Sequence, residues 1–313
     1  MDRALISLKL RSVLATALLL APSSRTLVRD ANLSDRLRQS AKHNLVTIPV
    51  QLNGGAAVPF ALDSGASSTI VNEKLASKLR LQQAKTVVGH GAGIGPCILR
   101  EMLQVKVRAG GGNVGSSVFA ASLEPLESFM GLPMNGVVGG TLFLTHVVSI
   151  DYRARTAYIS KTTNFVSRPN DIRILVTPSG SLCCVAHAEI QLHGMHWPAR
   201  LLIDTGALPF EVVLTREFAA QRNITVESRT EIVEVPGLCG MSKLAKSAAI
   251  AHIQGLPAIP AVIFVSTDNR GSLSSADFDG VIGSELLRRF GTVIFDARNH
   301  QVVLRLEGHS DHF

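Results

Sequence analysis

The chain carries the same sequence pattern twice, and this repeat limits its fold more than any other feature. One apolar stretch ends in Asp63-Ser-Gly-Ala, and a second ends in Asp204-Thr-Gly-Ala. A Gly-Val-Val-Gly segment that ends at Gly139 follows the first, and a Gly-Val-Ile-Gly segment that ends at Gly283 follows the second. Each half then closes on a similar apolar block. Matched blocks in the same order predict a gene duplication and two similar lobes.

The repeat also sets the expected domain organisation. We predict a first lobe over residues 42–160 and a second over residues 172–308, joined by the polar linker 161–171. Residues 1–23 have a basic start, a short apolar core and small residues at its end, which is typical of a secretory signal peptide. Residues 24–41 would then form an N-terminal arm. We expect an exported protein, periplasmic or secreted, with an uncleaved N-terminal membrane anchor as the alternative.

Composition excludes several classes of protein. Hydrophobic residues make up 46% of the chain and charged residues 18%, whereas intrinsic disorder requires low hydrophobicity and high net charge. The net charge is +7, but Lys and Arg are scattered without a basic run, so no nucleic-acid partner is expected. No apolar run reaches the roughly 18 residues that span a bilayer, so no stable membrane span should remain after signal cleavage.

Short apolar segments predict a mainly β fold. Strand periodicity occurs over residues 46–52, 103–107 and 185–192. A short helix is expected after Asn72, and another after Thr215, because both side chains can cap a helix N-terminus. The apolar side chains expected on the inner faces of these helices are Leu75, Leu79 and Phe218.

The two aspartates carry the chemistry that the repeat suggests. Each ends an apolar strand and is followed by a hydroxyl residue and a glycine, which permit a tight, braced turn. If the lobes are related by a pseudo-twofold axis, Asp63 and Asp204 meet at that axis. Two adjacent carboxylates cannot both ionise cheaply, so they share one proton. The ionised one can then take a proton from water while the protonated one polarises a carbonyl, without metal or cofactor.

These motifs resemble the aspartic protease superfamily, and most closely the bacterial retropepsin-like aspartyl proteases in a tandem two-lobe form. The resemblance implies two closed β-barrel lobes related by pseudo-twofold symmetry, an aspartic endopeptidase activity, and a peptide or protein substrate. It implies catalytic roles for Asp63 and Asp204. It also implies two glycine-rich flaps that cover the substrate, at Gly91, Gly93 and Gly237. The residues expected to support the catalytic loops are Ser64, Gly65, Ala66, Gly139, Thr205, Gly206, Ala207 and Gly283.

Two departures from this family leave alternatives open. Neither tyrosine of the chain lies in the first flap, which separates it from the pepsin type. The second aspartate loop is longer than the first, with Leu208-Pro-Phe where the first has Ser67-Ser-Thr. A non-catalytic peptide-binding module with a degenerate fold is therefore the rival to the enzyme. We expect a monomer with intramolecular lobe pairing, the alternative being a dimer in which lobes pair between chains.

The remaining candidate residues give weaker predictions. Cys97 and Cys239 occupy similar places at the two flaps, so a disulfide between them is a hypothesis, but two small apolar thiols that do not pair are the simpler interpretation. The adjacent Cys183 and Cys184 are not expected to pair with each other. The other candidates are polar residues of turns, for which we expect structural roles and no metal site: Asp151, Asp296, His193 and His196.

Overall fold

The computed structural model describes residues 40–306, apart from residues 116, 162–167, 193, 225–230, 254–255, 257–259, 269 and 275. The side chains of residues 248–251 also lie outside the description. The predicted signal peptide, nearly all of the arm and most of the linker fall outside the described residues. Within the described part of the chain, no helix has the length and apolar character needed to cross a membrane.

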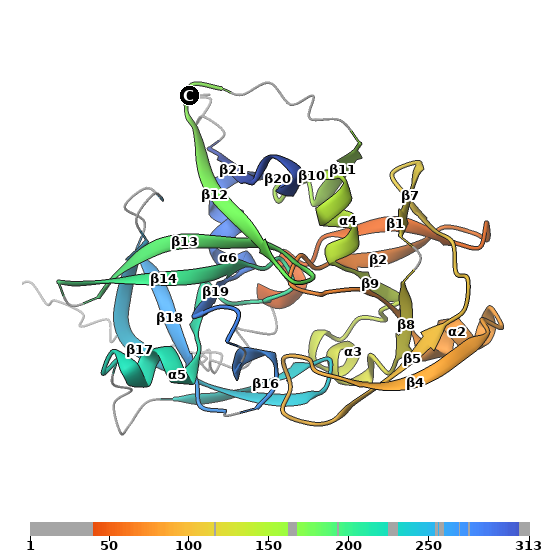
Figure 1. Cartoon of the computed structure of the whole chain (residues 1–313), viewed down its shortest axis with the longest axis horizontal. Helices are drawn as coiled ribbons and strands as arrows, with labels where there is room; N and C mark the ends of the chain where they lie inside the picture. Colours follow the sequence, from red (N-terminus) through yellow and green to blue (C-terminus); the bar gives the residue numbers. More distant parts are fainter. Residues whose placement is uncertain are drawn as a thin grey trace, which may run out of the picture. The chain divides into compact units, whose positions relative to one another are not determined.

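The fold is mainly β, and the first sheet comes entirely from the first half of the chain (Figure 1). It has nine strands in the described residues. In spatial order they are β4 (Gln83–Gly89), β5 (Cys97–Met102), β8 (Val118–Ala121), β3 (Thr69–Asn72), β9 (Gly136–Val138), β2 (Val58–Leu62), β1 (Thr47–Leu52), β6 (Val107–Ala109) and β7 (Gly112–Gly115).

The second sheet combines strands from both halves. Its first two strands precede the linker, so each half contributes to it. In spatial order the strands are β11 (Thr156–Ser160), β10 (Val147–Asp151), β20 (Thr292–Asp296), β21 (Gln301–Arg305), β12 (Asp171–Ser179), β13 (Leu182–Leu192), β14 (Met195–Ile203), β19 (Gly280–Ile282), β15 (Val212–Leu214), β18 (Ala261–Ser266), β17 (Gly240–Ile253) and β16 (Ile232–Gly237).

The expected closed barrels are not what the structure shows, because neither sheet closes as a whole. The first sheet ends at β4 and β7, which do not pair with each other in the described residues. In the second sheet, a short pairing of β13 with β17 curls one part back without closing the sheet. The physical reason in the first sheet is that β4 pairs only with β5, and their hairpin projects toward the second half of the chain (Figure 1).

The strand predictions are confirmed for two of the three segments. In β1, Ile48, Val50 and Leu52 are buried and alternate with more exposed residues, and Ile48 faces Phe60 across the β1–β2 pair. The strand predicted over residues 185–192 lies within β13, which pairs with β14. The strand predicted over residues 103–107 is wrong. The chain turns there with Gln104 at a φ of 50°, and only the last residue enters β6.

Both predicted helix starts are confirmed. Asn72 accepts a hydrogen bond from the amide of Lys74 at the start of α2 (Glu73–Lys78), and Thr215 caps α5 (Arg216–Gln221). Phe218 is buried as expected. Leu79 was also expected to be buried, but α2 ends before this residue and its side chain is 40% exposed. The other helices are α3 (Glu124–Met130), α4 (Gly140–Thr145) and α6 (Ser284–Leu287), with 3-10 turns at Ser272–Ser274, Arg288–Phe290 and Ala297–Asn299.

A shared core joins the two halves. Strand β10 from the first half pairs with β20 from the second. Phe143 of α4 packs edge-on against Phe295 of β20, with ring centroids 5.0 Å apart, and both side chains are fully buried. Aromatic pairs in this geometry add to the stabilisation that burial of their apolar surface provides. The halves are therefore packed as one body around the site described next.

Candidate active site

Asp63 and Asp204 occupy matching positions at the ends of two strands. Asp63 follows β2, and its amide donates to the carbonyl of Val138 over 3.1 Å. Asp204 follows β14, and its amide donates to the carbonyl of Ile282 over 2.9 Å. The acceptor strands β9 and β19 run parallel to β2 and β14 and are the Gly-Val-Val and Gly-Val-Ile segments of the repeat. The repeated blocks therefore meet in space at each aspartate.

Each aspartate is held by amides of its own loop. The Asp63 carboxylate accepts hydrogen bonds from the amides of Gly65 and Ala66, both over 2.9 Å. The Asp204 carboxylate accepts one from the amide of Gly206 over 2.7 Å. Such turns are common for aspartate because its short side chain reaches the backbone two residues ahead. One oxygen of each carboxyl group is thereby fixed in place.

The structure brings the two predicted aspartates together. The two carboxyl groups are close enough to interact, and each lies against the glycine of the other loop. A Cβ atom on Gly206 would collide with the Asp63 carboxyl group, and one on Gly65 would collide with that of Asp204. Both aspartates remain partly exposed. Glycine is therefore needed at both positions because any side chain would fill the space that the opposite carboxyl group uses.

A reciprocal network of hydroxyl groups ties the two loops to each other. The amide of Ser64 donates to Thr205 Oγ1, and the amide of Thr205 donates to Ser64 Oγ, both over 3.0 Å. Each hydroxyl then donates to a carbonyl of the opposite strand, Ser64 to Ile203 over 2.8 Å and Thr205 to Leu62 over 3.0 Å. Both hydroxyl residues are buried. This network fixes the spacing between the loops, and with it the separation of the aspartates.

Gly139 and Gly283, which were predicted to support the loops, pack against the backbone of these loops. A Cβ atom on Gly139 would lie 2.6 Å from the carbonyl oxygen of Ala66, and one on Gly283 would lie 2.6 Å from that of Ala207. Real Cβ contacts are not this short, so a larger residue would push the loop forward. The carbonyl of Ala207 also accepts the amide of Ser284 over 3.3 Å, and Gly140 donates to Ala66 in the same way.

The electrostatics of the pair favour a shared proton. Burial raises the pKa of Asp63 well above its usual value, and the neighbouring Asp204 carboxylate raises it further. Burial also raises the pKa of Asp204, while hydrogen bonds from Asp63 and from loop amides partly offset that effect. Close carboxyl groups of this kind titrate as a unit, so one proton stays on the pair over a wide pH range. One group is then an acid and the other a base.

An apolar pocket opens beside Asp63. Its walls come from both halves of the chain, and Asp63 and Gly206 form its polar end. Leu208 and Pro236 belong to the second half. The other lining residues are apolar and come from the first half: Ala41, Leu45, Ala61, Leu62, Leu126, Phe129, Met130, Met134 and Val137. These lining residues were not predicted, because their spacing along the chain has no period that marks a common wall.

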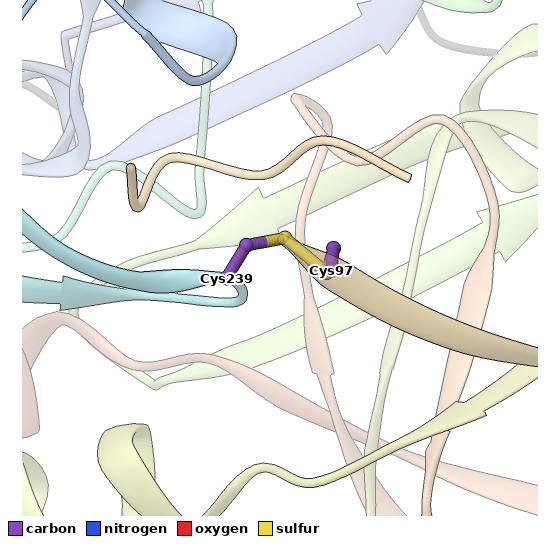
Figure 2. The surroundings of a disulfide bond; sticks show 2 residues. All are labelled: Cys97 and Cys239. Atoms are coloured by element: carbon purple, nitrogen blue, oxygen red, sulfur yellow. A yellow bond between two sulfur atoms is a disulfide. The ribbon is translucent and has the colours of Figure 1, made fainter. Parts of the chain in front are cut away.

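The glycine-rich segments form the tips of two hairpins that meet. Gly91 and Gly93 lie in the loop between β4 and β5, and Gly237 ends β16. A Cβ on Gly91 would lie 2.6 Å from the Cys239 sulfur, and Gly237 packs against the backbone at Gly93. Cys97 and Cys239 form a disulfide here, which decides between the two alternatives that the sequence left open (Figure 2).

Two buried cysteines lie below the loops. Cys183 and Cys184 are both free and inaccessible to solvent. The Cys183 thiol donates to the carbonyl of Ser64 over 3.5 Å, so it contacts the loop of the first aspartate from behind. No role for Cys183 was predicted, although its position at the start of an apolar segment indicates a side chain that faces the interior.

The other candidate residues have structural surroundings. Asp151 accepts the amide of Ala154 over 2.8 Å in a turn, and the buried Asp296 accepts the side-chain amide of Asn299 over 2.8 Å. His196 forms an ion pair with Glu189, while His193 lies outside the described residues. No group of three potential metal ligands occurs among the residues described.

Comparison with known proteins identifies a protein family for part of the chain. The fold and the paired carboxyl groups define a β protein with a two-aspartate centre. The family model of aspartyl proteases matches residues 48–139, a segment that contains Asp63 and ends at Gly139. This segment is an aspartyl protease domain of the retropepsin-like family. The match does not extend to Asp204. A search of curated proteins found no match.

Proposed function

We propose that the protein is an aspartic endopeptidase that hydrolyses peptide bonds with a water molecule activated between Asp63 and Asp204. The observation that carries this proposal is the adjacent pair of carboxyl groups, each fixed by its own loop and still partly open to solvent. The ionised carboxylate takes a proton from water as general base. The protonated carboxyl group donates to the peptide carbonyl, which makes its carbon easier to attack.

The corresponding hydrogen bonds at Asp63 and Asp204 support the hypothesis that the chain consists of two similar lobes. In this proposal the halves are duplicated lobes, and their pseudo-twofold axis passes between Asp63 and Asp204. A substrate would lie extended between the aspartate loops and the hairpin tips, held by strand-like hydrogen bonds. Its apolar side chains would use the pocket beside Asp63. Because both aspartates come from one chain, a monomer suffices for activity.

The pH dependence of activity follows from the shared proton. Activity requires one proton on the pair, so it falls at low pH, where both groups are protonated, and at high pH, where both are ionised. Because the pKa of Asp63 is raised well above its usual value, the fall at high pH should begin well above the range of an ordinary carboxyl group. The measurement is the rate of cleavage of denatured casein across pH 3 to 8.

Substitution of the aspartates tests the assignment. In Asp63→Asn and Asp204→Asn, cleavage should fall by at least about 10²-fold, because positioned acid–base groups contribute roughly 10²–10⁴-fold. Asp151→Asn is the matched control and should keep its activity, since Asp151 only accepts a turn hydrogen bond. Cleavage that survives in both aspartate variants contradicts the mechanism. Folded protein that binds casein without cleaving it supports the non-catalytic module instead.

We also propose that the protein is exported after removal of residues 1–23. The disulfide between Cys97 and Cys239 supports this, because such bonds persist in oxidising compartments. Mass spectrometry of the protein recovered from its producing cells should find an N-terminus near residue 24 and no reduced Cys97. An intact N-terminus in the membrane fraction would favour the anchored alternative.

A further inference from the structure

The tips of the β4–β5 and β16–β17 hairpins are joined to each other, and residues 89–97 and 237–242 of these tips are called the roof below. In Figure 2, Cys97 stands at the start of β5 and Cys239 at the turn between β16 and β17, with the disulfide joining them. The loop before Cys97 follows the turn closely: the amide of Gly95 donates to the carbonyl of Cys239 over 2.7 Å, and that of Ile94 donates to Met241 over 3.3 Å. The hairpins are therefore joined by backbone contacts as well as by a covalent bond.

A third segment also holds this loop. The amide of Ser272 donates to the carbonyl of Gly91 over 2.8 Å, and Gly271 packs against the carbonyl oxygens of Gly91 and Gly93. These residues belong to the second half, so the tip of the first-half hairpin lies between two segments of the other half. Gly93 has no space for a side chain at this junction, because a Cβ there would collide with the backbone of Gly240.

The roof lies over the aspartates. Pro236, in the strand before the turn, lines the same pocket as Asp63 and Gly206. Leu238, in the turn itself, packs against the same apolar cluster as Ala66 of the first aspartate loop. The opposite side is closed by the hydroxyl network between the loops. The two halves are therefore joined twice near the pocket, by the disulfide at the roof and by the hydroxyl network at the aspartate loops.

We propose that the disulfide makes the connection at the roof permanent, so that a polypeptide reaches the aspartates by threading a free end beneath the roof. The inference rests on the proposed peptidase function and specifies its substrate class: linear, extended chains with a free terminus. Head-to-tail cyclic peptides, and loops of folded proteins, are excluded while the disulfide is intact.

The length of the disulfide limits sideways access to the aspartates. The Cα atoms of Cys97 and Cys239 are 4.7 Å apart, and a disulfide allows no more than about 6.8 Å. An extended chain with its side chains needs a passage of about 10 Å, the distance at which sheets pack face to face. The roof therefore cannot part far enough to admit a chain from the side unless the disulfide is absent.

Paired linear and cyclic substrates test the proposal. A peptide of about 20 residues around a bond cleaved in casein would be made in linear and head-to-tail cyclic form. We expect the disulfide form of the protein to cleave the cyclic peptide at least 10-fold more slowly than the linear one. A variant carrying Cys97→Ser and Cys239→Ser should cleave both at rates within about 2-fold. If that variant does not fold, wild-type protein kept reduced serves in its place.

The outcomes separate the two proposals. Equal cyclic-to-linear rate ratios in the disulfide form and the disulfide-free form would overturn threading and leave the peptidase assignment intact. No cleavage of the linear peptide by either form would overturn the peptidase assignment and the inference with it. Amide hydrogen exchange gives a readout independent of catalysis: residues 89–97 and 237–242 should exchange faster without the disulfide, and unchanged exchange would contradict a roof held by that bond.

Discussion

At the scale of single residues, Asp63 should destabilise the fold at neutral pH. Its pKa is raised by burial and by Asp204, so the folded state keeps a proton that the unfolded chain releases above its usual pKa of 3.8. Stability therefore falls as the pH rises through the window between the usual and the raised pKa. Asp63→Asn removes this ionisable group. The melting temperature of the variant at pH 7 should therefore exceed that of the wild type, and the difference between the two melting temperatures should decrease toward pH 3.

Asp279 provides a control in which substitution by Asn should change the stability at pH 7 in the opposite direction. Burial alone would raise its pKa, but hydrogen bonds and charge attraction from Arg200 outweigh burial and lower the pKa. Asp279→Asn should therefore be less stable than the wild type at pH 7, and the loss should diminish as the pH falls through the usual carboxyl range. Thermal unfolding followed between pH 3 and 8 measures both variants. A destabilised Asp63→Asn protein at pH 7 would contradict the burial of that charge.

Gly206 should tolerate no side chain. In Gly206→Ala the new methyl group collides with the Asp63 carboxyl group, which must move. A displacement of about 1 Å of a catalytic group can cost about 10²-fold in rate, so kcat/KM on casein should fall by about that factor. Gly55→Ala is the matched control, because a Cβ there approaches only the carbonyl oxygen of Leu52, at 3.2 Å. Full activity in Gly206→Ala would show that the carboxyl groups do not need this geometry.

At the scale of elements, the two aspartate loops should depend on each other. Ser64→Ala and Thr205→Ala each leave buried backbone groups without partners, which costs about 1–3 kcal/mol. Because both hydroxyls belong to one network, the double variant should lose less than the sum of the single losses, with a coupling of at least about 0.5 kcal/mol. Chemical denaturation of the four proteins measures this coupling.

The cap of α5 gives the corresponding control. Thr215→Ala removes the hydroxyl that accepts the amide of Phe218, at a cost of about 1 kcal/mol. Combined with Ser64→Ala, its effect should add without coupling, because the helix cap and the loop network share no hydrogen bond. Additive losses for Ser64→Ala and Thr205→Ala would mean that the reciprocal bonds do not act as a unit.

At the scale of the whole molecule, the halves should unfold together. Strands β10 and β20 pair across the halves, and Phe143 packs against Phe295 in a common core. Scanning calorimetry should show one transition. Phe143→Ala should lower the free energy of unfolding of the protein by about 3–5 kcal/mol. The variant should still unfold in one transition. Two separate transitions in the wild-type protein would contradict a shared core.

The sequence determined those features that depend on residue type and local spacing. The repeat of Asp-(Ser/Thr)-Gly-Ala and of the later Gly-X-X-Gly segments identified the loops that meet, because only these residue types permit the turns and the close approach. Asn72 and Thr215 marked both helix starts, since capping depends on neighbouring residues. Leu79 and the segment 103–107 were predicted wrongly, because an apolar pattern does not show where a helix or strand ends.

Tertiary structure decided what depends on contacts between distant segments. The hairpins meet by extending toward the opposite half, so the first sheet stays open, and the same contact brings Cys97 to Cys239. The pocket beside Asp63 combines residues from both halves that no local pattern relates. Local patterns fix local backbone geometry. Only the packed chain fixes which strand edges pair, which side chains share a wall and which thiols come within bonding distance.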